Sequence, residues 1–158
     1  MNNHRRVNIA VYFAALVALA DQLVKWWVMT EVLGDLRTIP LTPFLNLVPN
    51  WNKGVTFGLF NHSANPWMPY VFIGVAGAIL FFLLRWLWQT SSMFVASALG
   101  LIMGGAIGNI VDRVRFGAVY DFLDFHYQGY HWYAFNVADS AIVAGVGLML
   151  VDSLARKR

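Results

Sequence analysis

Carboxylates and amides occur together at two places where apolar residues surround them. Asn109 and Asp112 are three residues apart, and Asn136 and Asp139 repeat the same Asn-x-x-Asp spacing. Residues at i and i+3 lie on one face of a helix, so each segment would present an amide beside a carboxylate. Asp121 is a further carboxylate, set among valine, tyrosine, phenylalanine and leucine.

Carboxylates held close together in a partly desolvated site share a proton, because two of them cannot both ionise cheaply. One can then act as a general base on a water molecule and the other as a general acid. We expect burial among apolar side chains to raise the pKa of Asp121, and a helix N-terminus to favour the charged form of Asp139. On spacing alone, helix caps and ion pairs with Arg113 and Arg115 explain the same residues equally well.

Other catalytic chemistry finds less support in the sequence. The chain has no cysteine, which excludes a thiolate nucleophile, a disulfide framework and a cysteine zinc site. Ser140 is interpreted as a residue at a helix start, since neither a G-x-S-x-G motif nor a P-loop is present. The histidines lack metal-ligand spacing and are expected to be interfacial or solvated; they are His4, His62, His126 and His131. We expect no metal and no cofactor.

The elements that position these groups must be membrane helices. Hydrophobic residues make up 59% of the 158 residues and charged residues only 12%, where a soluble domain carries about 25% charged residues. The charged residues leave gaps of membrane length, and a span needs about 20 apolar residues. The predicted fold is an all-α polytopic membrane protein, a single domain over residues 1–158, with four transmembrane helices at about 8–29, 67–88, 93–111 and 135–154.

The basic residues set the expected orientation. The formal net charge is +3, but the basic side chains gather at the chain ends and at the end of the second span, as the positive-inside rule predicts. Both termini are therefore expected in the cytoplasm, with the loops at 30–66 and 112–134 outside. Nucleic acid is not expected as a partner.

The N-terminus also imitates a cleavable leader. Two arginines precede an apolar run, and Ala18-Leu19-Ala20 before Asp21 resembles a signal peptidase site. Hydrophobicity resumes after Asp21, so we interpret the segment as one uncleaved helix.

Three local patterns add structural expectations. Asp21 and Lys25 stand four residues apart and could form an ion pair on one helix face, or take part in the site directly. Gly100, Gly104 and Gly108 also recur every four residues and would let a neighbouring helix approach closely. The first outer loop, about 38–60, is predicted to be a β-structured flap, with strands at 38–48 and 55–60 and turn residues at 50–54.

Four motifs in this order resemble those of bacterial lipoprotein signal peptidase, the signal peptidase II family. They are Asp21-Gln22-Leu23-Val24-Lys25, Asn52-Lys53-Gly54-Val55-Thr56-Phe57, the run of residues 104–122 from Gly104-Gly105 through Asn109 and Asp112-Arg113 to Asp121-Phe122, and Phe135-Asn136-Val137-Ala138-Asp139-Ser140. The resemblance covers almost the whole chain. One departure is Val55-Thr56, where many members have alanines.

The resemblance implies an aspartic endopeptidase of the cytoplasmic membrane that cleaves diacylglyceryl-modified prolipoproteins before the lipidated cysteine, without a metal. It makes Asp121 and Asp139 the catalytic pair, whereas Asp124 falls outside the motif position. Lining or substrate-holding roles go to Asn52, Gly54, Asn109, Arg113 and Asn136, and mainly structural roles to Asp21, Lys25 and Asp112. The flap would correspond to the family's small extracytoplasmic β-cradle.

The expected partners are the lipidated prolipoprotein and membrane lipid, and we expect a monomer with its active site at the outer face. A different class of protein remains as an alternative, a small transporter or proton-conducting protein with Asp21, Lys25, Asp112 and Asp139 as a relay through the membrane. A non-enzymatic membrane scaffold explains the glycine face but not the carboxylates.

Overall fold

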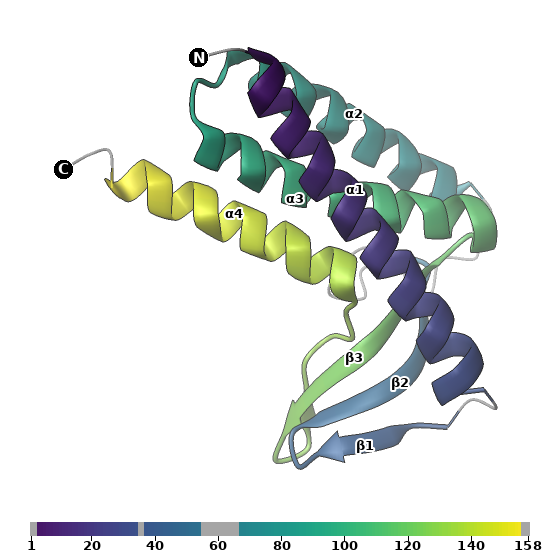
Figure 1. The fold of residues 1–158 in the computed structure, drawn as a ribbon. Helices are drawn as coiled ribbons and strands as arrows, with labels where there is room; N and C mark the ends of the chain where they lie inside the picture. The colour runs from purple at the N-terminus through teal and green to yellow at the C-terminus, as the bar shows by residue number, and fades with distance from the viewer. Residues whose placement is uncertain (1–2, 35–36, 55–66, 156–158) are drawn as a thin grey trace.

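The computed structural model describes residues 3–34, 37–54 and 67–155, which form four long helices and a small antiparallel sheet (Figure 1). All four helices are long and apolar enough to cross a membrane, which confirms the four predicted spans. The helices are α1 (Asn3–Trp27) with its π-helical continuation η1 (Val28–Val32), α2 (Met68–Gln89), α3 (Met93–Phe116) and α4 (Val137–Ala155).

Helix α3 is the centre of the bundle, because α1, α2 and α4 all pack against it. A Cβ atom added to Gly100 would lie 2.5 Å from the carbonyl oxygen of Ala10, and one added to Gly104 would lie 2.7 Å from that of Ala14. Real Cβ contacts are not that short, so only glycine permits this approach of two backbones. The predicted glycine face is confirmed, and it packs against α1.

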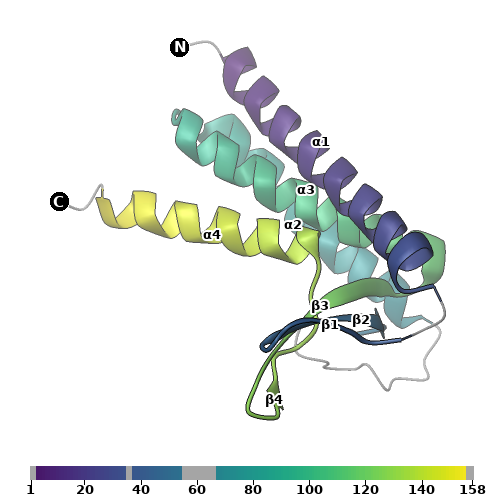
Figure 2. The same cartoon turned by 60° about the horizontal axis from the view of Figure 1, so that its bottom comes forward.

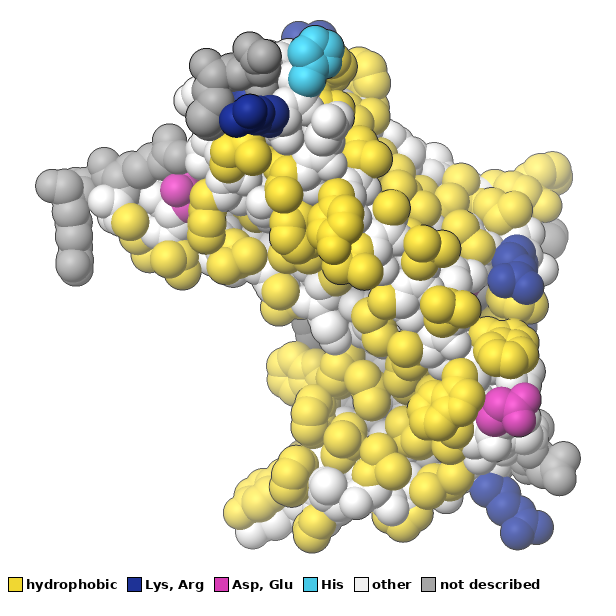
Figure 3. All heavy atoms as spheres, in the orientation of Figure 1, with side chains coloured by type: hydrophobic (Ala, Val, Ile, Leu, Met, Phe, Trp, Pro, Cys, Tyr) yellow, Lys and Arg dark blue, Asp and Glu magenta, His cyan; other side chains and the backbone are white. Residues whose placement is uncertain are grey.

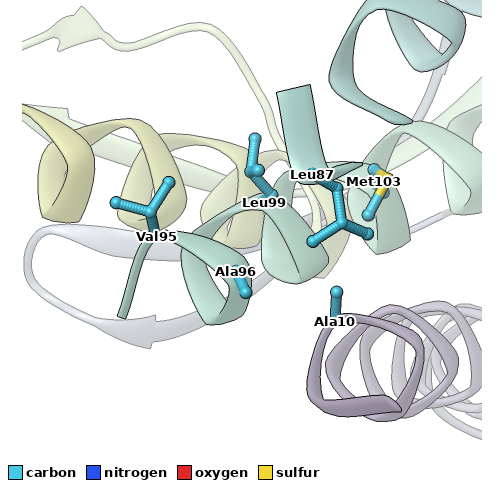
Figure 4. Close-up of a cluster of buried hydrophobic side chains, with 6 residues drawn as sticks. All are labelled: Ala10, Leu87, Val95, Ala96, Leu99 and Met103. Atoms are coloured by element: carbon cyan, nitrogen blue, oxygen red, sulfur yellow. The ribbon is translucent and has the colours of Figure 1, made fainter. Parts of the chain in front are cut away.

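An apolar core fills the junction of α1, α2 and α3 at the end of the bundle far from the sheet (Figure 4). Its members are Ala10, Leu87, Val95, Ala96, Leu99 and Met103. Since Ala10 lies upstream of the signal-peptidase-like sequence at residues 18–20, the first half of α1 is part of the packed bundle. Helix α1 also continues unbroken through that sequence to Trp27.

The two ends of the bundle differ in what they carry. Arg6 near the start of α1 donates a hydrogen bond to the carbonyl oxygen of Thr90, in the turn between α2 and α3. The start of α1 and the end of α4 lie at this end, and the sheet lies at the other (Figure 1). Because the number of long helices in the described residues is even, the start of α1 and the end of α4 lie at the same end of the bundle.

The sheet is assembled from both loops that the sequence places on one side. Its order is β1-β2-β3-β4, and every neighbouring pair is antiparallel. The strands are β1 (Ile39–Thr42), β2 (Leu45–Asn52), β3 (Val119–Tyr127) and β4 (Tyr130–His131). Figure 2 shows the sheet below the bundle, where β3 leads directly from α3 toward α4.

Three sequence predictions need correction or fall outside this description. Residues 50–52 were predicted to turn, but they belong to β2 and pair with β3. The predicted loop at 112–134 contains β3, which is buried on both faces near its start, so no alternation of polar and apolar residues marks it as a strand. The strand predicted at 55–60 lies outside the described residues.

Helix α3 also extends further than the predicted end at Val111. It continues through Asp112, Arg113 and Arg115 and ends at Phe116, because Gly117 adopts the left-handed conformation (φ 69°) that terminates a helix. The predicted span ends at Val111, immediately before the first charged residue, Asp112. Those charges are instead carried by the last turns of the helix, beside the sheet.

Most of the surface in the view of Figure 3 is hydrophobic, and the charged side chains lie at its margins. The exposed side chains on α2 and α4 are predominantly apolar. Such a surface suits a lipid environment and not water.

Candidate active site

Asp121 lies on β3 at the junction between the sheet and the helices, and only 1% of its surface is exposed. Two side-chain amides hold its carboxylate. Asn136 Nδ2 donates to Oδ1 at 2.7 Å, and Asn52 Nδ2, from the end of β2, donates to Oδ2 at 3.0 Å. Both oxygens of Asp121 are therefore held by neutral donors, one at the end of β2 and one immediately before α4.

Asp139 lies in the first turn of α4 and is held by a third amide. Asn109 Nδ2, from α3, donates to Asp139 Oδ1 at 2.8 Å. The backbone N–H of Asp139 donates to Asn136 Oδ1 at 2.9 Å, so Asn136 caps the helix on which Asp139 stands. The helix N-terminus adds a favourable field for a carboxylate at this position.

Asn136 connects the two aspartates. Its Nδ2 contacts Asp121 and also Asn109 Oδ1 at 3.2 Å, while its Oδ1 accepts from the backbone of Asp139. The side chain is completely buried. Asn136 is therefore a helix cap, as the alternative interpretation predicts. Because the same side chain also binds Asp121, capping is not its only role. We call Asp121 and Asp139 the aspartate pair.

Burial and, as a smaller cause, the negative charge of nearby Asp139 together raise the pKa of Asp121 to about 7. The hydrogen bonds from Asn52 and Asn136 and the charge of Lys25 act the other way, since they favour the ionised form. This is the raised pKa that the sequence predicts. A carboxyl group with a pKa near 7 can both bind and release a proton near neutral pH.

Arg113 and Gly54 border the aspartate pair. Arg113 Nη2 donates to the carbonyl oxygen of Gly54 at 2.9 Å, and Nη1 donates to that of Asn109 at 3.3 Å. The guanidinium lies 5.3 Å from the ring centre of Phe72 on α2, within the range of a cation–π contact. Gly54 N in turn donates to Asn52 Oδ1 at 2.9 Å, which orients the Asn52 amide.

A second polar group lies next to the aspartate pair and is built differently. Lys25 Nζ lies 2.8 Å from Asp21 Oδ2 and 2.8 Å from Asp112 Oδ2, and all three side chains are buried. The predicted pair of Asp21 and Lys25 is confirmed, and Asp112 is a third member. We call these three residues the lysine cluster. Asp112 therefore pairs with Lys25 and not with Arg113 or Arg115.

The lysine cluster fastens four elements together. Asp21 Oδ1 accepts from the backbone N–H of Ala138, in the first turn of α4, at 2.9 Å. Asp112 Oδ2 accepts from the backbone N–H of Tyr120 on β3 at 3.1 Å. These backbone groups adjoin Asp139 and Asp121. The cluster thus fixes the two segments that carry the aspartate pair.

Lys25 also reaches the aspartate pair through one intermediate. Its Nζ donates to Asn109 Oδ1 at 3.3 Å, and Asn109 holds Asp139. A relay through the membrane would need ionisable groups at successive depths, but the residues named for it contact one another or share Asn109. This arrangement disfavours the transporter alternative.

Asp124 belongs to a separate contact further along the sheet. His131 Nδ1 lies 2.9 Å from Asp124 Oδ2, and Asn46 Nδ2 donates to the same oxygen at 3.0 Å. Asp124 therefore ties β2, β3 and β4 together, away from the aspartate pair. The ring of His126 stacks on that of His131 at 5.3 Å.

Two participants were missed by the sequence reasoning. Gln22 Nε2 donates to Asp112 Oδ1 at 2.7 Å and extends the lysine cluster across α1. An amide in an apolar helix next to Asp21 was the available signal. Asn46 gave no signal, because an asparagine in an outer loop is ordinary.

Comparison with known proteins gives consistent matches over most of the chain. A family model described as "Signal peptidase (SPase) II" matches residues 13–155. A lipoprotein signal peptidase of Solibacter usitatus is 45% identical over 148 residues, which cover 92% of this chain and 90% of the relative. One from Paraburkholderia phymatum is 46% identical over 147 residues, covering 92% and 87%.

Two solved structures of bacterial membrane enzymes, both obtained by the in meso method, share the fold. One has a TM-score of 0.80 at 28% sequence identity and covers 94% of this chain and 88% of its own. The other has a TM-score of 0.78 at 28% identity and covers 92% of each chain.

Proposed function

The chain belongs to the signal peptidase II family, and from that premise we propose that Asp121 and Asp139 are the catalytic residues of an aspartic endopeptidase. As a family member it is a multi-pass membrane hydrolase of the bacterial inner membrane that removes signal peptides from prolipoproteins. The observation that carries the proposal is the amide-lined aspartate pair, in which one asparagine, Asn136, contacts both members.

The reaction uses one proton shared by the pair. Asp139, ionised at the N-terminus of α4, takes a proton from water as the water oxygen attacks the scissile carbonyl carbon. Asp121, protonated because burial raises its pKa to about 7, gives its proton to the carbonyl oxygen. When the C–N bond breaks, the nitrogen takes the proton from Asp139, and a hydroxyl of the intermediate returns one to Asp121. The pair ends as it began.

The neighbouring amides have a positioning role in this scheme. Asn52 and Asn136 donate to Asp121, and Asn109 donates to Asp139, so each carboxylate is held without a counter-cation. A lysine or arginine bonded to either carboxylate would fix it in the ionised form. Arg113, bonded to Gly54 and stacked over Phe72, borders the space where the peptide would lie.

We propose that the substrate is a diacylglyceryl prolipoprotein, cut before its lipidated cysteine, and that the enzyme acts as a monomer surrounded by membrane lipid. Both termini would face the cytoplasm and the sheet the outer side, since Arg5, Arg6 and Arg85 lie toward the helix ends far from the sheet. The aspartate pair then lies at the outer membrane surface, where the scissile bond of a membrane-anchored signal peptide is presented.

The proposal is tested by a cleavage assay in detergent with lipidated and unlipidated prolipoprotein side by side. The wild-type enzyme should cut the lipidated form, and Asp139→Asn should not. Equal cleavage of the unlipidated form would contradict the substrate assignment. Normal turnover by Asp139→Asn would contradict the mechanism, provided that both proteins unfold at the same temperature.

A further inference from the structure

The ammonium group of Lys25 makes three contacts, and one of them leaves the lysine cluster. Nζ lies 2.8 Å from Asp21 Oδ2 and 2.8 Å from Asp112 Oδ2, and it donates to Asn109 Oδ1 at 3.3 Å. A lysine ammonium has three N–H donors and no acceptor, so these contacts can use all of its donors. Lys25 is buried. The third contact therefore connects a buried cation to the asparagine that holds Asp139.

The contact with Lys25 decides which way the Asn109 amide points. Because an ammonium can only donate, the oxygen of the amide must face it and the nitrogen must face the other way. That nitrogen, Nδ2, donates to Asp139 Oδ1 at 2.8 Å. Asn136 Nδ2 donates to the same Asn109 oxygen at 3.2 Å. If the amide were turned over, its oxygen would face the Asp139 carboxylate and all three hydrogen bonds would be lost.

The same direction of donation continues to Asp121. Asn136 Nδ2 donates to Asp121 Oδ1 at 2.7 Å, and Asn136 Oδ1 accepts from the backbone N–H of Asp139. Ionised carboxylates can only accept. The amide network of the aspartate pair therefore lies between carboxylates that accept and a buried cation that donates, and each amide has one orientation that satisfies both.

The positive charge of Lys25 also acts on Asp121. It opposes the raised pKa of that carboxyl group, because a nearby cation favours the ionised form. Arg113 bonds the backbone oxygen of Asn109 and not its amide side chain, so it cannot set the direction of that side chain. The other charged groups that face Lys25 or Asp121 come from α1, α3 and α4; with Arg113 they are Asp21, Asp112, Arg115 and Asp139.

We propose that Lys25 is a positioning residue for the hydrolysis as well as an anchor of the fold. Its ammonium fixes the Asn109 amide with the nitrogen toward Asp139, which holds that carboxylate in place and favours the ionised form that a general base needs. Lys25 acts through Asn109 and does not touch the reacting atoms. The inference rests on the function proposed above.

Steady-state kinetics of Lys25→Met test this role, with Gln22→Met as the matched control. Gln22 lies on the same helix and donates to Asp112 at 2.7 Å, but its described contacts do not include Asn109. Per folded enzyme, kcat of Lys25→Met should fall about tenfold with KM unchanged, because a base that is not held in place is often misaligned. The kcat of Gln22→Met should stay close to the wild-type value.

The pH profile of kcat is a second readout. In the proposed mechanism Asp121 must be protonated to donate, so kcat falls as the pH rises through its pKa of about 7. Since the charge of Lys25 opposes the rise of this pKa, its loss should move the alkaline limb of kcat to higher pH in Lys25→Met and not in Gln22→Met. A role in folding alone would lower the unfolding temperature and leave the limb in place.

An uncharged version of the lysine cluster separates chemistry from folding. Lys25→Met combined with Asp21→Asn and Asp112→Asn leaves no unpaired charge in the cluster, and uncharged replacement of a buried ion triad is often neutral for stability. The asparagine oxygens can still accept from the two backbone N–H groups that the carboxylates bind. This triple variant should therefore fold but keep a lower kcat than the wild type, since no cation orients Asn109.

Two results would overturn the positioning role. One is a wild-type kcat per folded enzyme in the triple variant, which would mean that Lys25 only anchors the fold. The other is an equal loss of kcat in Lys25→Met and Gln22→Met, which would mean that any loosening of the cluster has this effect. If the wild-type enzyme does not cut a diacylglyceryl prolipoprotein, the proposed function fails; if it does and the variants keep its kcat, only this inference fails.

Discussion

Two clusters of buried carboxylates lie side by side in this protein. They differ in the side chain that contacts both carboxylates of each cluster. In the lysine cluster, the ammonium of Lys25 lies 2.8 Å from both Asp21 and Asp112. In the aspartate pair, the shared neighbour is the amide of Asn136. A cation between two carboxylates holds them in the charged form, whereas an amide only orients them.

We propose that this difference separates a structural site from a chemical one. The lysine cluster bonds the backbone of Ala138 and Tyr120, and so it anchors α4 and β3. The carboxylates of the aspartate pair are instead held by side-chain amides, Asn52 and Asn136 on Asp121 and Asn109 on Asp139. The raised pKa of Asp121 follows from burial and from the charge of Asp139, without a bonded counter-charge.

The largest effect is expected from the aspartate pair. Asp121→Asn should lower kcat about 10³-fold or more, because a carboxylate that transfers protons contributes about 10²–10⁴-fold and an amide cannot replace it. The unfolding temperature should stay within a few degrees of the wild type. Cleavage kinetics and thermal unfolding in detergent measure the two quantities. Loss of activity together with loss of folding would instead place Asp121 with the structural group.

Removal of the Lys25 ammonium should mainly lower the stability of the protein, whereas Asp121→Asn should mainly lower kcat. Lys25→Met leaves Asp21 and Asp112 buried without a partner charge, and breaking such a pair costs roughly 3–5 kcal/mol of stability. Chemical unfolding in detergent measures this loss, with Arg37→Met, a change at an exposed arginine before β1, as the control. A fully stable Lys25→Met protein would contradict the anchoring role of the cluster.

The pH dependence of cleavage sharpens the comparison further. Since Asp121 must be protonated to donate, kcat should fall as the pH rises through about 7. The same raised pKa means that folding stability is lost, not gained, as the pH rises from about 4 to 7. Asn52→Ala removes a hydrogen bond that favours the ionised form, so the alkaline limb should move upward by a fraction of a pH unit. A downward shift would show that the Asn52 bond has the opposite effect.

The smallest effect is expected at Asp124, the third carboxylate of the same sheet. It pairs with His131, which is largely exposed, and accepts from Asn46. Asp124→Asn should cost at most about 1 kcal/mol of stability and change kcat by less than about threefold. A loss comparable with that of Asp121→Asn would remove the distinction between the two positions.

The sequence predicts the parts of both groups that repeat locally. The structure confirms the ion pair implied by the i,i+4 step from Asp21 to Lys25 and the glycine face on α3. The two Asn-x-x-Asp spacings turn out differently: Asn136 caps α4 through the backbone of Asp139, while Asn109 bonds Asp139 and Asp112 bonds Lys25. The resemblance to the family then selected Asp121 from neighbouring Asp124. The assignment of catalysis to the aspartate pair itself stays a proposal.

Long-range partners could not be predicted in the same way. Asp112 contacts Lys25, which lies 87 residues earlier in the sequence. No local spacing of residues predicts that contact. Strand β3 was missed because its first residues are buried on both faces, and the end of α3 was misplaced because charged residues were taken to mark the end of the span. Each error concerns a segment whose conformation is decided by tertiary packing.

The most direct measurement of the central claim is an infrared titration of the protonated carboxyl groups in the wild-type enzyme and in Asp121→Asn. The wild type should show one carboxyl band that disappears with a midpoint near pH 7. The band should be absent in Asp121→Asn, retained in Asp124→Asn, and shifted to a lower midpoint in Asp139→Asn, where the neighbouring negative charge is removed. A band that persists unchanged in Asp121→Asn would contradict the proton-sharing aspartate pair.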